Sequence, residues 1–393
     1  MKKIISIILA LSFVFSLCIC ADAEDNALRF DENGNFRILQ ISDPQDDHYP
    51  AYDLVNFIKL AIDEFDPDLI VMTGDIVEDS RAGDLGIDGE SFREGVKVNG
   101  DYNQTFMNVK KTCEAVFSEA ESRGIPFAIT QGNNDYGSGV TNEDWLKIYS
   151  EYEHCLTADM SNDADGRIDY NLEILGSDGK PAFNLWMMDN GRGISAEQIA
   201  WYESESTKLT EANGGKPVPA IVFEHIPVDD MGNLFEECNF WDEGAVLEGG
   251  KCYRLIDGLA DGYYAGAIAP GQSSEQFASW KKQGDVIGAY FGHWHTTGWT
   301  GVYDGIELGF TYGCEFAKPG PYGVRVFDIN ENDVENFGSK LYTYEGSAKK
   351  GNARFELQTD EPYKVYSNPI EEFFGAIRNI IELLSREIKQ LLS

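Results

Sequence analysis

The sequence predicts an α/β layered domain, and three observations support this fold class. Short apolar runs rich in β-formers alternate with segments whose apolar residues recur at helical spacing. This alternation is typical of sheets and helices that pack in layers. Residues able to bind metals follow several of the apolar runs, as expected at the edge of such a sheet. The 393 residues, 42% of them hydrophobic, are enough for one large domain with insertions.

The N-terminus has the pattern of a Sec-type signal peptide. A basic start at residues 2–3 precedes an apolar run at 4–19, and Ala21-Asp22-Ala23 supplies the small-x-small pattern of a cleavage site. The run is short for a membrane-spanning helix, and acidic residues follow it. We therefore expect cleavage after Ala23 and a secreted, extracellular protein. A lipid-modified Cys20 is an alternative, although the residue directly before it is not small.

Residues 24–365 form the predicted domain. Its strands are expected at 36–42, 69–72, 126–130, 218–223, 286–291 and 323–329, and its helices at 51–65, 109–121 and 195–209. A hairpin is expected around Ser177-Asp178-Gly179-Lys180. Residues 229–272 are glycine-rich and acidic, so we interpret them as a long loop insertion rather than a domain. Long loops of this kind often act as lids over a site.

The tail at 366–393 has the pattern of an amphipathic helix. The residues of its apolar face are Ile370, Phe373, Phe374, Ile377, Ile380, Ile381, Leu384, Ile388 and Leu391. Some of them also repeat every seven residues, which permits a short coiled coil. The sequence leaves three roles open: docking on the protein's own core, pairing with a partner helix, or lying on a membrane surface.

Charge and cysteine content restrict the partners and the covalent structure. A net charge of −36 repels phosphate backbones, so no nucleic acid partner is expected. Five cysteines follow the signal peptide without a C-x-x-C pair, so a structural zinc site is not expected. Cys238 and Cys252 flank one glycine-rich loop and are the best candidates for a disulfide.

Residues with metal-binding side chains stand at the ends of five predicted strands. They are Asp43, Asp75, Asn133, His225, His293 and His295. Ligands of α/β sheets gather at the carboxyl ends of strands, so these side chains are expected to converge. Three of the five histidines in the chain belong to this set. Carboxylate, amide and imidazole ligands together suit iron, manganese or zinc.

The ordered motifs resemble those of the calcineurin-like metallophosphoesterases. Asp43-Pro44-Gln45, Gly74-Asp75, Gly132-Asn133-Asn134-Asp135, His225 and Gly292-His293-Trp294-His295 stand where that family has D-x-H, G-D-x, G-N-H-[DE], a single histidine and G-H-x-H. The surrounding residues, including 38–43, 165–172 and 185–191, resemble the purple-acid-phosphatase-like branch of plants, fungi and bacteria. The resemblance spans about residues 36–330.

This resemblance implies a four-layer αββα sandwich with two metal ions, divalent or of mixed valence, and Fe, Mn or Zn as candidates. Carried over residue by residue, Asp75 would bridge the two metals. The first metal would be held by Asp43 and His295, and the second by Asn133, His225 and His293. A water or hydroxide between the metals would then attack the phosphorus of a small phosphomonoester or phosphodiester.

The sequence departs from the family pattern twice. Gln45 replaces the histidine of D-x-H, and its amide oxygen ligates metals without the affinity of imidazole. Glu78 is a candidate to fill this gap, or else a solvated surface charge. Asn134 replaces the histidine that assists the leaving group, and an amide cannot give up a proton at neutral pH. Asp135 is a candidate acid, or else orients its neighbours. These replacements keep a second function open, a catalytically degenerate metal-binding module of the same fold.

Overall fold

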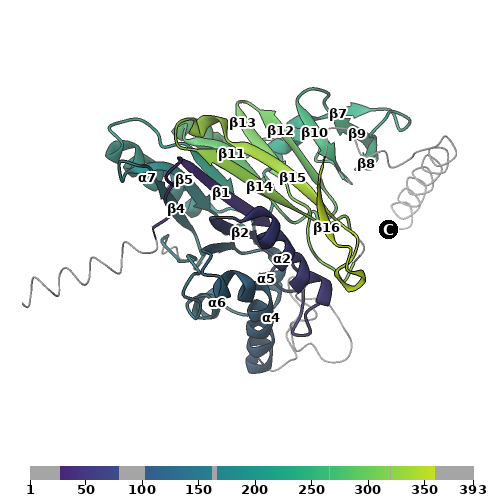
Figure 1. Cartoon of the computed structure of the whole chain (residues 1–393). Coiled ribbons are helices and arrows are strands. Elements are labelled where there is room, and N and C mark those ends of the chain that lie inside the picture. The colour runs from purple at the N-terminus through teal and green to yellow at the C-terminus, as the bar shows by residue number, and fades with distance from the viewer. Residues whose placement is uncertain (1–26, 79–101, 162–165, 265, 319, 359–393) are drawn as a thin grey trace, which may run out of the picture.

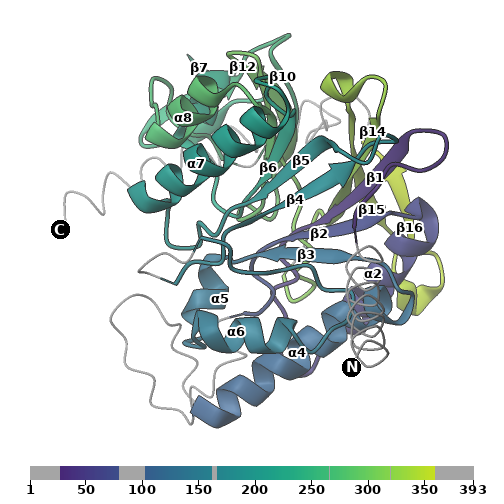
Figure 2. The same cartoon turned by 90° about the vertical axis from the view of Figure 1, so that its left-hand side faces the viewer.

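The computed structural model describes residues 27–78, 102–161, 166–264, 266–318 and 320–358. The predicted signal peptide and the predicted C-terminal helix lie outside the described residues. Two β-sheets pack face to face, and helices cover their outer faces (Figure 1, Figure 2). The four-layer αββα sandwich is therefore confirmed. No helix among the described residues combines the length and apolarity needed to cross a membrane.

The first sheet has six strands in the order β16-β15-β14-β1-β2-β3. Their bounds are Asn35–Ile41 (β1), Leu69–Thr73 (β2), Phe127–Thr130 (β3), Gly323–Asn330 (β14), Gly338–Glu345 (β15) and Arg354–Leu357 (β16). Strands β1, β2 and β3 run parallel, and the other neighbours are antiparallel. Because β1, β2 and β3 are parallel, their carboxyl ends reach the same edge of the sheet.

Helices α2 (Tyr52–Phe65) and α4 (Tyr102–Ser122) pack against the first sheet. Each buries apolar residues at helical spacing, which is why the sequence folds them against a sheet. Helix α4 begins at residue 102 rather than at the predicted 109. The apolar pattern does not reveal the first turns because their sequence is mainly polar. The short helices α5 (Asn133–Gly137) and α6 (Asn142–Tyr149) follow β3.

The second sheet has seven strands in the order β10-β12-β13-β11-β6-β5-β4. Their bounds are Tyr170–Leu175 (β4), Pro181–Met187 (β5), Ala220–Phe223 (β6), Ala260–Tyr263 (β10), Val286–Phe291 (β11), Gly298–Tyr303 (β12) and Ile306–Phe310 (β13). Strands β5, β6, β11 and β13 run parallel. Helices α7 (Ala196–Ala212) and α8 (Glu275–Gln283) lie on the outer side of this sheet, as Figure 2 shows. The remaining short elements are the 3₁₀ helices η1 (Asp229–Leu234), η2 (Val334–Asn336) and η3 (Ala348–Lys350).

Aromatic rings join the inner faces of the two sheets. The ring centroid of Phe327, on β14, lies 4.5 Å from that of Tyr290 and 5.4 Å from that of Phe223. All three side chains are buried, and both contacts are edge-to-face, a favourable arrangement for aromatic quadrupoles. This packing fixes one sheet against the other, and with it the strand ends that face each other at the shared edge.

The prediction of a loop at 229–272 is wrong. This segment contains η1, the strands β7 (Phe235–Cys238), β8 (Val246–Glu248) and β9 (Lys251–Leu255), and β10. Strands β7, β9 and β8 form a small sheet of their own, whereas β10 pairs with β12 of the second sheet. Gly249 and Gly250 have φ of 57° and 83°, so they form the two-residue hairpin turn between β8 and β9.

The register of the small sheet bears on the predicted disulfide. Cys238 on β7 lies directly opposite Cys252 on β9. Both cysteines are unbonded in the structure, so the predicted bond is not formed there. Residues that face each other across antiparallel strands have Cβ atoms about 4.5–5.5 Å apart, a little more than a disulfide needs. The pair therefore requires only a small local approach to become bonded.

Candidate metal centre

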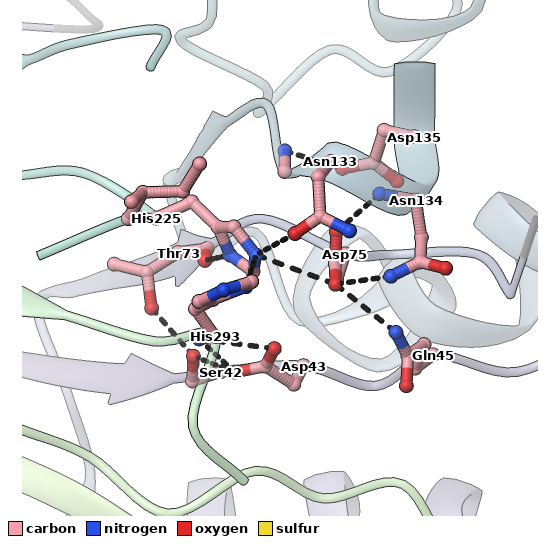
Figure 3. Close-up of polar contacts among 12 residues, drawn as sticks. Ser42, Asp43, Gln45, Thr73, Asp75, Asn133, Asn134, Asp135, His225 and His293 are labelled. Carbon is pink, nitrogen blue, oxygen red and sulfur yellow. Dashed lines mark hydrogen bonds and ion pairs between the residues drawn. The ribbon is translucent and has the colours of Figure 1, made fainter. Parts of the chain in front are cut away.

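Metal-binding side chains from both sheets meet at one edge of the sandwich. The first sheet contributes Asp43, Asp75 and Asn133, and the second contributes His225, His293 and His295. Each stands just beyond the carboxyl end of its strand, where the sequence places it. Figure 3 shows how the side chains of Asp43, Asp75, Asn133, His225 and His293 converge. Among the described residues, two groups bring their ligand atoms within 4.8 Å of one another.

The first of these groups contains Asp75, His225 and His293. The Nδ1 atom of His225 lies 2.8 Å from the Thr73 carbonyl oxygen, so in the neutral ring Nδ1–H donates and Nε2 keeps its lone pair. That Nε2 lies 3.2 Å from His293 Nδ1 and 3.1 Å from the Oδ1 atom of Asn133. Electron-rich atoms this close together need a shared proton or cation. The donor set therefore fits a metal ion.

The second group contains Asp43, Asp75 and His295. His295 Nε2 lies 3.3 Å from Asp43 Oδ1. Asp75 belongs to both groups, as a carboxylate that bridges two cations must. This group offers a single imidazole where the other offers two, so its donor set is the poorer one for a transition metal.

The backbone at four of these positions is left-handed. The residues with positive φ are Asp43 (48°), Gln45 (40°), Asp75 (50°) and His293 (70°). Such conformations cost about 1–3 kcal/mol each for residues other than glycine and persist only where surrounding contacts impose them. Here the Gln45 N–H donates to the Asp75 carbonyl at 2.8 Å, and the His293 N–H donates to the Asp43 carboxylate at 3.0 Å. The ligand loops thus hold one another in place.

Glycines allow the ligand loops to approach closely. A Cβ atom added at Gly132 would lie 2.2 Å from an Asp75 carboxylate oxygen, and one at Gly292 would lie 2.1 Å from Ser42 Oγ. Both contacts are impossible for any side chain. The glycine that precedes Asn133 and the one that precedes His293 are therefore structural requirements of the centre.

The two replacements found in the sequence both face Asp75. Asn134 Nδ2 donates to Asp75 Oδ2 at 2.6 Å, and the Asn134 N–H donates to Oδ1 at 2.7 Å. Gln45 Nε2 donates to the same Oδ2 at 3.0 Å (Figure 3). A metal would need the Gln45 oxygen instead, so ligation by Gln45 requires its amide to rotate.

Asp135 faces away from the ligand atoms. It is fully buried, and its carboxylate accepts from the N–H groups of Ile76 (2.8 Å), Val77 (3.2 Å) and Gly132 (2.8 Å). These contacts tie the loop after β2 to the loop after β3, which is the geometry of an orienting residue rather than of an acid. Glu78 belongs to neither ligand group among the described residues.

Residues 36–297 match the family model of the calcineurin-like phosphoesterases, which is more than half of the chain. The chain belongs to the calcineurin-like phosphoesterase family.

Relatives of this phosphoesterase-family chain include two Arabidopsis thaliana proteins. It is 25% identical over 372 residues to "probable inactive purple acid phosphatase 14", covering 82% of each chain. It is 23% identical over 380 residues to "probable inactive purple acid phosphatase 29", covering 83% of this chain and 87% of the relative. A solved structure of a dimetal phosphatase from Danio rerio aligns with a TM-score of 0.48 and 11% identity, covering 83% of this chain and 98% of that one.

Electrostatics in the candidate metal centre favour bound cations. Burial by itself would raise the pKa of Asp43, but His295 and His225 outweigh it and lower that pKa to about 2. Burial opposes protonation of His225, yet Asp75 and Asp43 raise its pKa to about 9. Asp43 likewise raises the pKa of His295 to about 10 against the effect of burial. The carboxylates therefore hold protons on two imidazoles, and metal ions would displace those protons.

Sequence reasoning missed two residues that support the ligands. Asn190, after β5, accepts from the N–H groups of His225 (3.0 Å) and Ile226 (2.8 Å) and donates to the Ile226 carbonyl at 2.6 Å. Glu315, after β13, is buried with its Oε2 3.0 Å from His295 Nδ1. The available signal was general: a metal-binding histidine commonly has an oxygen partner behind it, but no spacing identifies that partner.

Proposed function

We propose that this protein is a secreted, metal-dependent phosphoesterase that hydrolyses small phosphomonoesters or phosphodiesters. The observation that carries the proposal is the pair of ligand groups that share Asp75 at the carboxyl edge of the sandwich. Family membership supports the same reaction class. Secretion is inferred from residues 1–23 alone, and the acidic surface argues against a nucleic acid substrate.

The donor atoms support two sites of different quality. Asp75, Asn133, His225 and His293 would hold one Fe, Mn or Zn ion, and Asp43, Asp75, His295 and a rotated Gln45 would hold the other. Bound together, such ions would lower the pKa of a coordinated water and offset the charge of a phosphoryl group. The chain itself would set the orientation of these ligands through the hydrogen bonds of Asp135 and Asn190.

Asn134 determines whether a side chain of this protein can protonate the leaving group. Its amide is half-buried and donates to Asp75, so it stands beside the shared ligand of both metal groups as a neutral donor. It can hold a substrate oxygen but cannot protonate a departing alkoxide. Substrates with good leaving groups are therefore expected to react fastest.

A second candidate function is metal and ligand binding without turnover. The replacements at Gln45 and Asn134 favour it, and so do the names of the two Arabidopsis relatives, which describe those proteins as probably inactive. Retention of the other ligands around Asp75 favours the enzyme.

One experiment separates the two functions. Mature protein is reconstituted with Fe, Mn or Zn, its metal content is measured by mass spectrometry, and a panel of aryl and alkyl phosphomonoesters and phosphodiesters is assayed. Two metals per chain together with hydrolysis of any ester support the phosphoesterase. A protein with no turnover under every metal condition is the binding module.

A further inference from the structure

A buried carboxylate lies behind His295. Glu315 Oε2 is 3.0 Å from His295 Nδ1, on the side of the ring opposite to the Nε2 atom that faces Asp43. The side chain of Glu315 is 1% exposed. Its other close partner is the ammonium group of Lys318 at 2.9 Å, and that lysine is largely exposed.

The position of Glu315 is fixed by the same backbone that carries the ligands. The Cys314 N–H donates to the carbonyls of Ser42 (3.0 Å) and Asp43 (3.1 Å). The Gly313 N–H donates to the carbonyl of His295 at 2.9 Å. The segment that ends in Glu315 is thus hydrogen-bonded both to the loop of Asp43 and to His295 itself, so the backbone that carries the carboxylate is held against both.

Burial of a carboxylate is costly unless a donor compensates it. The groups that compensate it are His295 Nδ1 and the Lys318 ammonium group. A carboxylate beside Nδ1 favours the tautomer with its proton there, so that Nε2, on the side of Asp43 and the shared Asp75, can bind a metal once its own proton is displaced. A carboxylate behind a ligating imidazole fixes its tautomer and ring orientation and raises its basicity as a ligand. The corresponding partner of His225 is only a neutral carbonyl, that of Thr73.

The site that Glu315 supports is also the one with only a single imidazole. Gln45 stands where the family has a histidine, so His295 is the single imidazole of the group formed with Asp43 and Asp75. The stronger partner therefore supports the histidine whose site has the weaker donor set.

We propose that Glu315 is a positioning residue that compensates for Gln45 by strengthening His295 as a metal ligand, an inference that rests on the metal binding in the proposed function. The carboxylate acts on the site of Asp43 and His295 and leaves the site of His225 and His293 unaffected.

The test is a titration of full mature protein with Mn²⁺, followed by the electron paramagnetic resonance signal of the free ion. Two backgrounds isolate the sites: His225→Ala leaves the Asp43–His295 site, and Asp43→Asn leaves the other. Glu315→Gln is expected to weaken Mn²⁺ binding about 10–100-fold in the first background and to change it less than twofold in the second. Adding Gln45→His to Glu315→Gln in the first background is expected to restore the affinity.

Glu224→Gln is the matched control. Glu224 is also a fully buried glutamate at the end of a central strand, but its carboxylate accepts from Gln276 (2.8 Å) rather than from a ligand. Its variant should leave the first site unchanged. Equal weakening of both sites by Glu315→Gln, or no weakening, would overturn the inference while two bound ions still support the proposed function. Wild-type protein that holds fewer than two ions under every Fe, Mn and Zn condition, measured by mass spectrometry, would overturn both.

Discussion

Replacing Asn134 with histidine tests whether the centre lacks a proton donor for the leaving group. Asn134 Nδ2 is 2.6 Å from Asp75 and the side chain is half-buried, so an imidazole at this position can keep that contact with one nitrogen and present the other to the substrate. General-acid assistance contributes about 10²–10⁴-fold, which at 1.36 kcal/mol per tenfold is about 3–5 kcal/mol of barrier. We expect Asn134→His to raise kcat on alkyl phosphates within this range.

The assay compares kcat for an alkyl phosphate with kcat for p-nitrophenyl phosphate, whose leaving group needs little protonation. The aryl ester should gain less than tenfold. Asn134→Gln, which keeps an amide without a transferable proton, serves as the control and should not improve either substrate. An equal gain on both esters, or a gain with Asn134→Gln as large as with histidine, would refute the assignment of this position to leaving-group assistance.

Four further predictions concern the metals, the core, the small sheet and the tail. Asp75→Asn should abolish hydrolysis and remove at least one metal per chain, because the charge shared by both ligand groups is lost; mass spectrometry of the purified variant would disprove this by finding two metals and full activity. Phe327→Ala should lower the free energy of unfolding by about 3–5 kcal/mol, because its ring is buried between the sheets; chemical denaturation measures it, and a loss below 1 kcal/mol would contradict the packing argument. Cys238 and Cys252 should form a disulfide slowly under oxidising conditions, because burial raises the pKa of Cys238 to about 11; mapping of the peptides by mass spectrometry would reject this if both thiols persist at alkaline pH. Deleting 368–393, which lie outside the described residues, should change the oligomer mass or membrane attachment but not catalysis; a large fall in melting temperature at unchanged mass would show instead that the tail docks on the protein's own core.

Local signals predict the α/β layers and most of the centre, whereas the four-layer sandwich is implied by the family resemblance. The strands β1, β2, β3, β6 and β11 are short and mainly apolar, and each is followed by a glycine or polar turn that presents a ligand such as Asp75 or His225. Chain direction alone then brings these ends to one edge. The small sheet was mistaken for a loop because β7 and β8 are very short and only half-buried, although Gly249-Gly250 was a usable hairpin signal.

The residues that contact the metal ligands from behind, Glu315 and Asn190, could not be predicted in the same way. Glu315 reaches His295 only after the chain has formed β12 and β13 and returned to the same edge. Asn190 reaches His225 from the neighbouring strand. Both contacts depend on the register of paired strands, and a single carboxylate or amide far along the chain carries no mark of such a role.

The left-handed backbone at the ligand positions also restricts which amino acids can occupy them. Asparagine, aspartate and histidine adopt positive φ more readily than other residues with a Cβ, and these types are also good metal ligands. Asp43, Asp75 and His293 satisfy both demands, whereas Gln45, at φ 40°, belongs to a type that adopts this backbone less readily. Replacing Gln45 with histidine would therefore suit the backbone conformation as well as a bound metal ion.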